Sequence, residues 1–378
     1  MCESNKVKIN YNGMKILLFG EYSGLFNCLK DGLIELGHEV FLASDGNGYK
    51  DYPSDFRWDA HTKGRLKKFH APFCAANIWL HKNSFVGYDI VYLVAPNFVS
   101  THKWVNGPIY EFLFKHNKRV YLCGAGIGSI LFDYWYESDT KYHEYMRGYF
   151  EEYIHPPFYH NRPLREWENY LLKKVDGYIP IWYEYAEPFR NYPSCRKTIR
   201  IPININQFEY KPNVIKDNKI VFYHGVTRPC KGTRFIRPAF EKMKQKYGNK
   251  AEFICAEKLP FNDYMKVVEK TNVIVDDANS YSIAMNGLFS LLKGKLIMGG
   301  AEPIANKELG IEGVNPVFNI CPNVDQICSV IEEIIQRRDE IEELGLKGRQ
   351  FVEQYHNNID IAKEYIKIWE EDLNSLSL

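Results

Sequence analysis

The chain has 378 residues, and at ~150 residues per domain this length predicts two domains. A formal net charge of +1, with 25% charged residues, excludes the broad cationic field of a nucleic-acid-binding protein. Apolar residues make up 45% of the chain, yet no window approaches the ~18 uncharged residues of a transmembrane helix. The amino-terminal sequence MCESNKVKIN lacks the apolar core of a secretory signal. These features predict a cytoplasmic protein that does not bind nucleic acid.

The nine cysteines are scattered singly, without a CxxC pair. We find no companion histidines at the spacing of metal ligands, so the sequence predicts neither a disulfide framework nor a metal site. Reduced thiols are the expectation. The aromatic content of 15% favours carbohydrate chemistry, because aromatic faces pack against sugar rings, although filling the core is the default use of such residues.

After a polar extension over residues 1–13, the first half of the chain predicts alternating strands and helices. The apolar run MKILLFG, at 14–20, has the pattern of a buried parallel strand, and a helix and a second strand follow it over 21–44. Further buried strands are expected at 87–96, 118–126 and 175–182, with a helix over 108–116. This order predicts a doubly wound sheet in a domain that ends near Asn206.

Two glycine turns in this half are candidate phosphate sites. Gly20 and Gly24 flank the first strand-to-helix turn, where the backbone can approach a ligand closely. The second turn, GAGIGS, has Ser129 at the third glycine position of a dinucleotide fingerprint, and no acidic residue closes a strand about 20 residues later. The second turn therefore does not predict nicotinamide binding.

Residues 131–172 form an aromatic and charged insertion after a predicted strand, and HPP at His155 divides it into two helical patterns. An insertion at the carboxyl end of a strand is a candidate surface for an acceptor substrate. The alternative is a helical pair that only covers the sheet.

The segment VFYHGVTRPCKGT opens a second α/β unit. An apolar strand ends in Gly225, and Arg228 and Lys231 follow in a short turn before an amphipathic helix. Glycine, the oriented N–H groups of a helix start, a guanidinium and an ammonium together can cradle a diphosphate. The alternative is a solvated pair of cations in a loop.

From residue 271 the chain reads as a buried strand, an acidic turn, a loop, a short apolar helix and another strand. With the preceding turn, this order resembles the carboxyl-terminal half of GT-B glycosyltransferases, specifically the retaining group called family 4. In that family a Gly-x-x-Arg-x-x-Lys-Gly turn binds the donor's diphosphate, and a Glu-x7-Glu pair holds the donor sugar and ribose. Tyr281 and Phe289 stand at the two glutamate positions. Asp276, Asp277 and Asn279 either supply hydroxyl contacts from a shifted position or cap the strand end.

Other segments extend the resemblance. The sequence RIPININQFEY, at 200–210, is similar to the family's hinge, so the second domain is expected over 207–357. An amphipathic helix over 358–378 is expected to cross back to the first domain.

The resemblance implies an α/β GT-B fold, with two Rossmann-like domains facing a central cleft. It implies a metal-independent, retaining glycosyltransferase with a nucleotide-diphosphate sugar as donor and no separate cofactor. The acceptor would be a glycan or lipid-linked saccharide in polysaccharide or glycoconjugate biosynthesis, so peripheral association with the inner face of a membrane stays open. The alternative is a catalytically degenerate homologue that binds a nucleotide sugar, a glycan or a partner protein.

The candidate site residues follow from these motifs. An inverting reaction would need a general base, for which Glu21, Asp133 and His160 are the candidates. The predicted catalytic residues are Arg228 and Lys231, and the predicted donor-binding residues are Gly20, Gly24, Gly225, Asp277, Asn279, Tyr281, Asn286 and Phe289.

Overall fold

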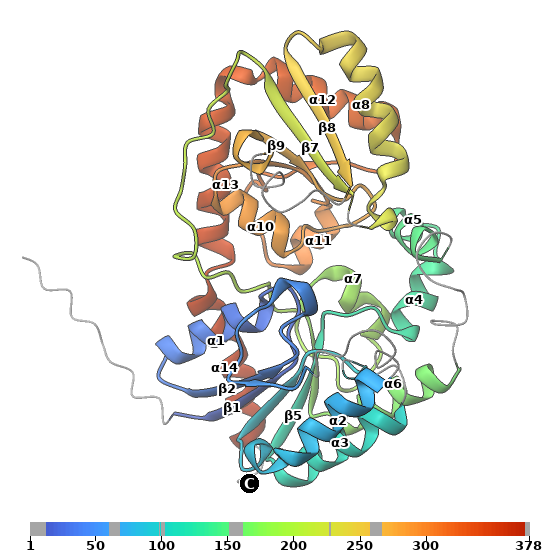
Figure 1. Ribbon diagram of the computed structural model, residues 1–378, viewed down its shortest axis with the longest axis vertical. Helices are drawn as coiled ribbons and strands as arrows, with labels where there is room; N and C mark the ends of the chain where they lie inside the picture. The colour runs from blue at the N-terminus through green and yellow to red at the C-terminus, as the bar shows by residue number, and fades with distance from the viewer. Residues whose placement is uncertain are drawn as a thin grey trace, which may run out of the picture. The chain divides into compact units, whose positions relative to one another are not determined.

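The computed structural model describes residues 13–59, 69–97, 99, 103–150, 162–226, 228–257 and 267–374 (Figure 1). These residues form two compact units: unit 1 is Met1–Tyr121 with Asn358–Leu378, and unit 2 is Leu122–Asn357. The predicted boundary near Asn206 stays a prediction. Within the described ranges, none of the helices has the length and apolar character needed to cross a membrane.

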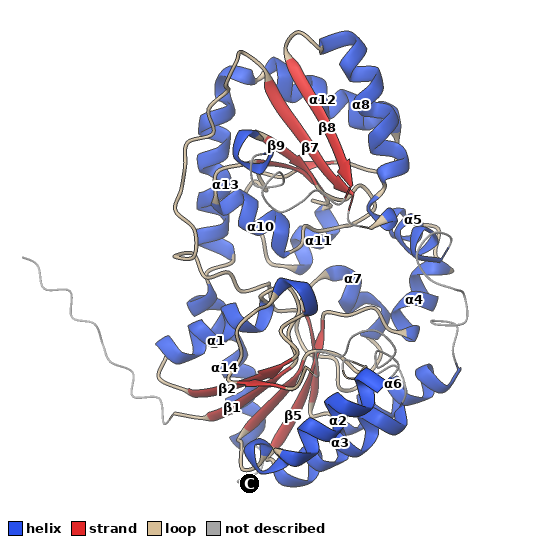
Figure 2. Ribbon diagram, viewed as in Figure 1, coloured by secondary structure: helices blue, strands red, loops and turns tan. Residues whose placement is uncertain are grey.

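The first sheet contains six parallel strands in the order β3-β2-β1-β4-β5-β6 (Figure 2). Its elements, in chain order, are β1 (Lys15–Phe19), α1 (Leu25–Glu35), β2 (Glu39–Ser44), β3 (Phe56–Arg57), α2 (His70–Leu80), β4 (Ile90–Leu93), α3 (Lys103–His116), β5 (Arg119–Gly124), α4 (Ser129–Tyr136), α5 (Lys141–Gly148), α6 (Arg162–Lys174), β6 (Gly177–Pro180) and α7 (Tyr183–Ala186). The predicted alternation of strand and helix is confirmed.

The strands of this sheet are short and continuous in their burial. All four residues of β4 and all four of β6 are buried, as expected for parallel strands covered on both faces. The helix predicted from Pro108 begins earlier, at Lys103, and holds Pro108 in its interior. Proline is frequent in the first turn of a helix, so the sequence placed the helix start too late.

Helix α2 gives one correction to the sequence analysis. His70 and Cys74 are four residues apart in this helix, and the His70 Nε2 and Cys74 Sγ atoms are 3.5 Å apart. The expectation that no cysteine has a companion histidine at ligand spacing is therefore wrong.

The last helix, α14 (Asn358–Asn374), packs against α1 in unit 1. Asn358 Nδ2 donates a hydrogen bond of 3.1 Å to the carbonyl oxygen of Cys28. A Cβ at Gly32 would meet the carbonyl oxygen of Asn358, so the close approach of the two helices requires glycine there. Trp369 of α14 is fully buried.

The second sheet contains five parallel strands in the order β11-β10-β9-β7-β8. Its elements are β7 (Ile220–Val226), the 3-10 turn η7 (Pro229–Lys231), α8 (Thr233–Tyr247), β8 (Ala251–Glu257), β9 (Val273–Val275), α10 (Met285–Leu292), β10 (Leu296–Gly299), α11 (Pro303–Glu308), β11 (Phe318–Asn319), α12 (Val324–Gln336) and α13 (Ile341–Tyr355). Four more 3-10 turns occur in the chain: η1 (Gly48–Lys50), η3 (Lys82–Phe85), η6 (Glu187–Phe189) and η8 (Arg338–Glu340).

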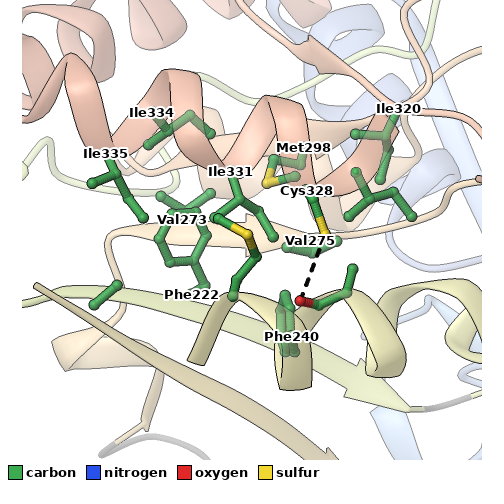
Figure 3. Close-up of a cluster of buried hydrophobic side chains, with 14 of the residues drawn as sticks. Phe222, Phe240, Val273, Val275, Met298, Ile320, Cys328, Ile331, Ile334 and Ile335 are labelled. Carbon is green, nitrogen blue, oxygen red and sulfur yellow. Dashed lines mark hydrogen bonds between the residues drawn. The ribbon is translucent and has the colours of Figure 1, made fainter. Parts of the chain in front are cut away.

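Helices α8 and α12 pack together over one face of this sheet, and the core lies beneath them (Figure 3). Phe222 of β7 and Val273 of β9 are fully buried, and Phe240 of α8 and Ile331 of α12 close the core above them. This rigid sheet fixes the positions of the loops that follow β7 and β9.

The insertion at 131–172 is helical in its described parts, as α4, α5 and α6. The predicted break at His155 lies outside the described residues. Glu168 of α6 accepts hydrogen bonds of 2.9 Å from the backbone N–H groups of Ser129 and Ile130, which begin α4. A carboxylate of the protein thus occupies the helix start that follows GAGIGS.

Candidate functional site

The diphosphate turn predicted from the sequence, Gly225–Gly232, packs against the loop that follows β9. Gly232 has a φ of 82°, and a Cβ there would lie 2.9 Å from the Cβ of Ala278. Ala278 N donates to the carbonyl oxygen of Lys231 at 3.2 Å, and Asn279 Nδ2 donates to the carbonyl oxygen of Cys230 at 2.6 Å. Glycine at 232 therefore permits a close contact that places both loops side by side.

Lys231 forms a buried ion pair in this loop pair. Its Nζ lies 2.6 Å from Oδ1 of Asp276, whose side chain is only 4% exposed. Burial opposes the charge on the lysine, but Asp276 and Asp277 outweigh it and raise the pKa of Lys231. The ammonium is therefore charged at neutral pH and has further N–H groups to donate.

Asp277 lies beside this pair and titrates differently. Burial raises the pKa of Asp277 to about 7, while Lys231 opposes the shift. Its Oδ1 accepts a hydrogen bond of 2.8 Å from the backbone N–H of Asn279, which is an Asx turn. Near neutral pH this carboxyl is partly protonated, so the loop repels an anionic ligand less than two full carboxylates would.

Arg228 lies at the solvent side of the turn. Its side chain is exposed, and Nη1 donates a hydrogen bond of 3.1 Å to the hydroxyl of Tyr149. Cys230 is buried, and burial raises its thiol pKa to about 12, so it is a packing residue of the turn. The exposed guanidinium is thus available to a ligand, whereas the thiol is not.

Tyr281 brings a carboxylate that the sequence analysis missed. The Oε1 atom of Glu184, in α7, accepts hydrogen bonds from the backbone N–H groups of Tyr281 at 2.6 Å and Ser282 at 3.1 Å. Glu184 is fully buried, and burial raises its pKa to about 7. A carboxyl group therefore lies beside a position where the family pattern has one, although a different element supplies it.

Three polar atoms around this loop are buried without a hydrogen-bond partner. They are Oε2 of Glu184, Oδ1 of Asn279 and Oγ of Ser282. Buried polar groups are nearly always paired, and an unpaired one indicates a missing water or ligand. The three atoms are a donor or acceptor set suited to hydroxyl groups.

Aromatic side chains adjoin the same loop. The ring of Tyr281 packs against Trp135, Tyr142 and Tyr183, with ring centroids 5.1 to 6.3 Å apart. These contacts hold the loop that carries the unpaired atoms.

The remaining predicted donor residues are not brought into this group by any recorded contact. Phe289 of α10 packs against Phe208, with ring centroids 5.2 Å apart, and Asn286 is exposed. Gly225 stands near the end of β7, where a Cβ would lie 3.0 Å from the hydroxyl of Tyr223. Their roles in binding a donor stay predictions.

In unit 1 the turn of Gly20 and Gly24 is occupied by the protein itself. Gly20 N donates to the carbonyl oxygen of Ala43, and Gly24 N donates to Oε1 of Glu21, at 2.8 Å each. The other carboxylate oxygen of Glu21 binds Asn27. Glu21 thus caps α1, and the N–H groups of these two glycines are engaged rather than open to a phosphate.

The first turn of α8 differs from those of α1 and α4. Its N-cap is Gly232, where no side chain caps the helix, whereas Glu21 and Glu168 bind the first turns of α1 and α4. His224 nearby is buried, with Nδ1 2.8 Å from the carbonyl oxygen of Val275 and Nε2 2.8 Å from Oγ1 of Thr233. Burial lowers the pKa of His224 to about 4, so it is a neutral structural residue.

The insertion contains a cavity of about 220 Å³ between α4 and α6. Tyr134 and Tyr192 line it, together with Asp133 and Arg165, which form an ion pair. Tyr134 is 43% exposed. This cavity is a candidate subsite on the predicted acceptor surface, and the third candidate base, His160, lies outside the described residues.

No family model matches the chain, and no curated protein matches it. Among solved structures, a sucrose-phosphate synthase from Thermosynechococcus elongatus has a TM-score of 0.62 and 15% identity, covering 96% of this chain and 100% of that chain. HepE from Anabaena, in complex with UDP and glucose, has a TM-score of 0.59 and 14% identity, covering 94% and 99%. A glycosyltransferase from Rickettsia africae has a TM-score of 0.55 and 13% identity, covering 96% and 99%.

The chain has a GT-B fold. At these identities the similarity establishes the architecture, and the function has to be argued from the residues of the site. The GT-B expectation from the sequence is confirmed, and membership of family 4 stays a prediction.

Proposed function

We propose that the chain is a glycosyltransferase that moves a sugar from a nucleoside-diphosphate donor to a glycan or lipid-linked saccharide. The observation that carries this proposal is the turn at the start of α8, where Arg228 is exposed and Lys231 is held charged beside Asp276. The GT-B neighbours support a nucleotide donor, since HepE is described in complex with UDP, with UDP and glucose, and with UDP-glucose.

The chemistry follows from the charges of the turn. Negative charge develops on the leaving diphosphate as the glycosidic bond breaks, and Arg228 and Lys231 stabilise it without a metal ion. Asp277 modulates this field, because its protonated form leaves the two cations less opposed than its charged form does. Metal independence and retention of configuration belong to the proposal through the family resemblance.

The donor sugar is proposed to lie at the loop of Asn279, Tyr281 and Ser282. The unpaired atoms of Asn279, Ser282 and Glu184 support this position, because sugar hydroxyls can donate to and accept from them. In this view Glu184 supplies the carboxyl that Tyr281 lacks. The acceptor is proposed to bind beside α4 and α6, where Tyr134 and Tyr192 offer faces for a sugar ring.

A lipid-linked acceptor would bring the chain to a membrane surface, and unit 1 carries a face that fits an anionic bilayer. Helices α2 and α3 and the turn η3 expose six large apolar side chains: Phe69, Phe73, Trp79, Leu80, Val86 and Trp104. Lys82 Nζ lies 5.8 Å from the centroid of the Trp79 ring. Residues 60–86 contain five Lys and Arg and no Asp or Glu, so the segment is suited to anionic lipid headgroups.

The second candidate function is a binding module without turnover. It is favoured by one observation: the N–H groups of Tyr281 and Ser282 already bind Glu184, so a protein carboxyl occupies part of the proposed sugar site. Such a protein would bind a nucleotide sugar and leave it intact.

Thermal shift with a panel of UDP, GDP, ADP, CDP and dTDP tests the donor site. A ligand at ~100 times its dissociation constant adds ~2.7 kcal/mol of stability. One nucleotide is expected to stabilise the wild type and the control Arg237→Ala, whose arginine is exposed on α8 and pairs with Glu257, but not Arg228→Ala. Equal stabilisation of Arg228→Ala and the control would remove the basis of the proposal.

A further inference from the structure

Three side chains of unit 1 meet where β3 ends and α2 begins. Nε2 of His70 lies 3.5 Å from Sγ of Cys74 and 3.6 Å from Oδ1 of Asp59. The potential ligand atoms of all three residues lie within 4.8 Å of one another. The cluster thus combines a thiol, an imidazole and a carboxylate at one point.

The same imidazole nitrogen faces both neighbours. In a nucleophilic relay the thiol and the carboxylate would contact different nitrogens of the histidine, one as base and the other as orienting group. Here Nε2 is near both Sγ of Cys74 and Oδ1 of Asp59. The three atoms therefore surround a common point instead of forming a chain, which is the arrangement of ligands around a cation.

The distances match a tetrahedral centre. Zinc bonds of ~2.0 to 2.1 Å to nitrogen, ~2.0 to 2.2 Å to oxygen and ~2.3 Å to sulfur, at the tetrahedral angle, separate the ligand atoms by ~3.3 to 3.6 Å. The nitrogen-to-sulfur distance of 3.5 Å and the nitrogen-to-oxygen distance of 3.6 Å agree with this range.

The surrounding backbone holds the three residues in place. Trp58, next to Asp59, is 1% exposed, and its N–H donates to the carbonyl oxygen of Ser44 at 3.1 Å. Asn77 of α2 donates to the carbonyl oxygen of Arg57 at 3.4 Å, which ties the helix to the end of β3. The site is therefore supported by regular elements on both sides.

We infer that Asp59, His70 and Cys74 bind a thiophilic divalent cation of the zinc class. Cys74 is 2% exposed, whereas the side chains of Asp59 and His70 are 17% and 43% exposed, so one side is open for a water as the fourth ligand. A thiolate and a carboxylate neutralise a dication. Sulfur and imidazole ligands favour zinc over magnesium or calcium, which prefer oxygen.

The inference does not depend on the glycosyltransferase proposal, and it departs from the expectation of no metal site. A bound cation would join β3 to α2 across residues 60–68. Its role is structural, because it links two elements of unit 1 and no substrate is invoked.

Titration of the full, reduced chain with Co²⁺ and Zn²⁺ in metal-free buffer tests the site. One equivalent of Co²⁺ should give a sulfur-to-cobalt charge-transfer absorption that Zn²⁺ abolishes. Cys74→Ser, His70→Gln and Asp59→Asn should each lower Zn²⁺ affinity by at least ~10-fold, since second-shell losses alone cost about that much. The control is Cys255→Ser, whose thiol is half-buried and belongs to no such cluster.

The inference is overturned if no charge-transfer absorption appears, or if it survives in Cys74→Ser. It is also overturned if only Cys74→Ser lowers affinity, because a single surface thiol would then hold the ion. Circular dichroism of each variant shows whether it is folded, and the Asp59→Asn variant, whose carboxylate is near the surface, provides a folded test if Cys74→Ser is not folded.

Discussion

Removing Lys231 should destabilise the protein even without a ligand. Its ammonium is the partner of Asp276, which is 4% exposed, so Lys231→Met leaves a buried carboxylate without its cation. Breaking a buried ion pair by removing one partner typically costs ~3 to 5 kcal/mol. The lysine side chain is 21% exposed, which permits some hydration of the remaining carboxylate, so we expect about 3 kcal/mol.

Urea unfolding at pH 7.5 measures this effect, and Arg228→Met is the matched control. Both variants remove one cation from the same turn, but Arg228 is exposed and has one hydrogen bond, to Tyr149. An exposed contact of this kind contributes roughly 1 kcal/mol or less. The Lys231→Met/Asp276→Asn double variant should recover at least half of the loss.

Two results would refute this reasoning. One is an unfolding midpoint of Lys231→Met equal to that of Arg228→Met. The other is a double variant no more stable than Lys231→Met, because the cost would then not come from the unpaired carboxylate of Asp276.

Three further predictions concern titration and the exposed face of unit 1. The folded pKa of Asp277 lies near 7, against an ordinary 3.8, so stability should fall as pH rises from about 4 to 7; Asp277→Asn should gain up to about 4 kcal/mol over the wild type between pH 5 and 8 in urea unfolding, and an unchanged difference would contradict this. The folded pKa of His224 is about 4 against 6.5, so its contribution is lost as pH falls from 6.5 to 4; His224→Gln should flatten that loss in thermal unfolding, and an equal slope would exclude His224 as the cause. In co-sedimentation with phosphatidylserine vesicles, Trp104→Ser and Leu80→Ser should each reduce binding, whereas Val314→Ser, at a 93% exposed position in unit 2, should not; equal binding by all three would exclude the α2–α3 face.

The fold could be predicted from the sequence because buried parallel strands are continuous apolar runs. The runs around Leu17, Val91 and Phe222 each became a central strand, and glycines marked the turns after them. The two-residue strand β3 carries no such run, so it was missed. The position of Pro108 inside α3 was missed because proline signals a helix start more often than an interior position.

The candidate site was only partly predictable. Arg228, Lys231 and Asp277 were found because they share a turn and a loop with recognisable residue spacing. Glu184 was missed because its contact with Tyr281 joins residues 97 positions apart, which local spacing does not encode. Glu21 followed a glycine turn that looked open, and only the structure shows that its carboxylate binds the N–H of Gly24.

The most direct test of glycosyl transfer is turnover of the nucleotide sugar that the binding panel identifies. Mass spectrometry of the donor incubated with the wild type should show release of the nucleoside diphosphate, and Arg228→Ala should slow the release by roughly 100- to 1,000-fold. A donor that binds the wild type and remains intact would contradict the account and establish a binding module instead.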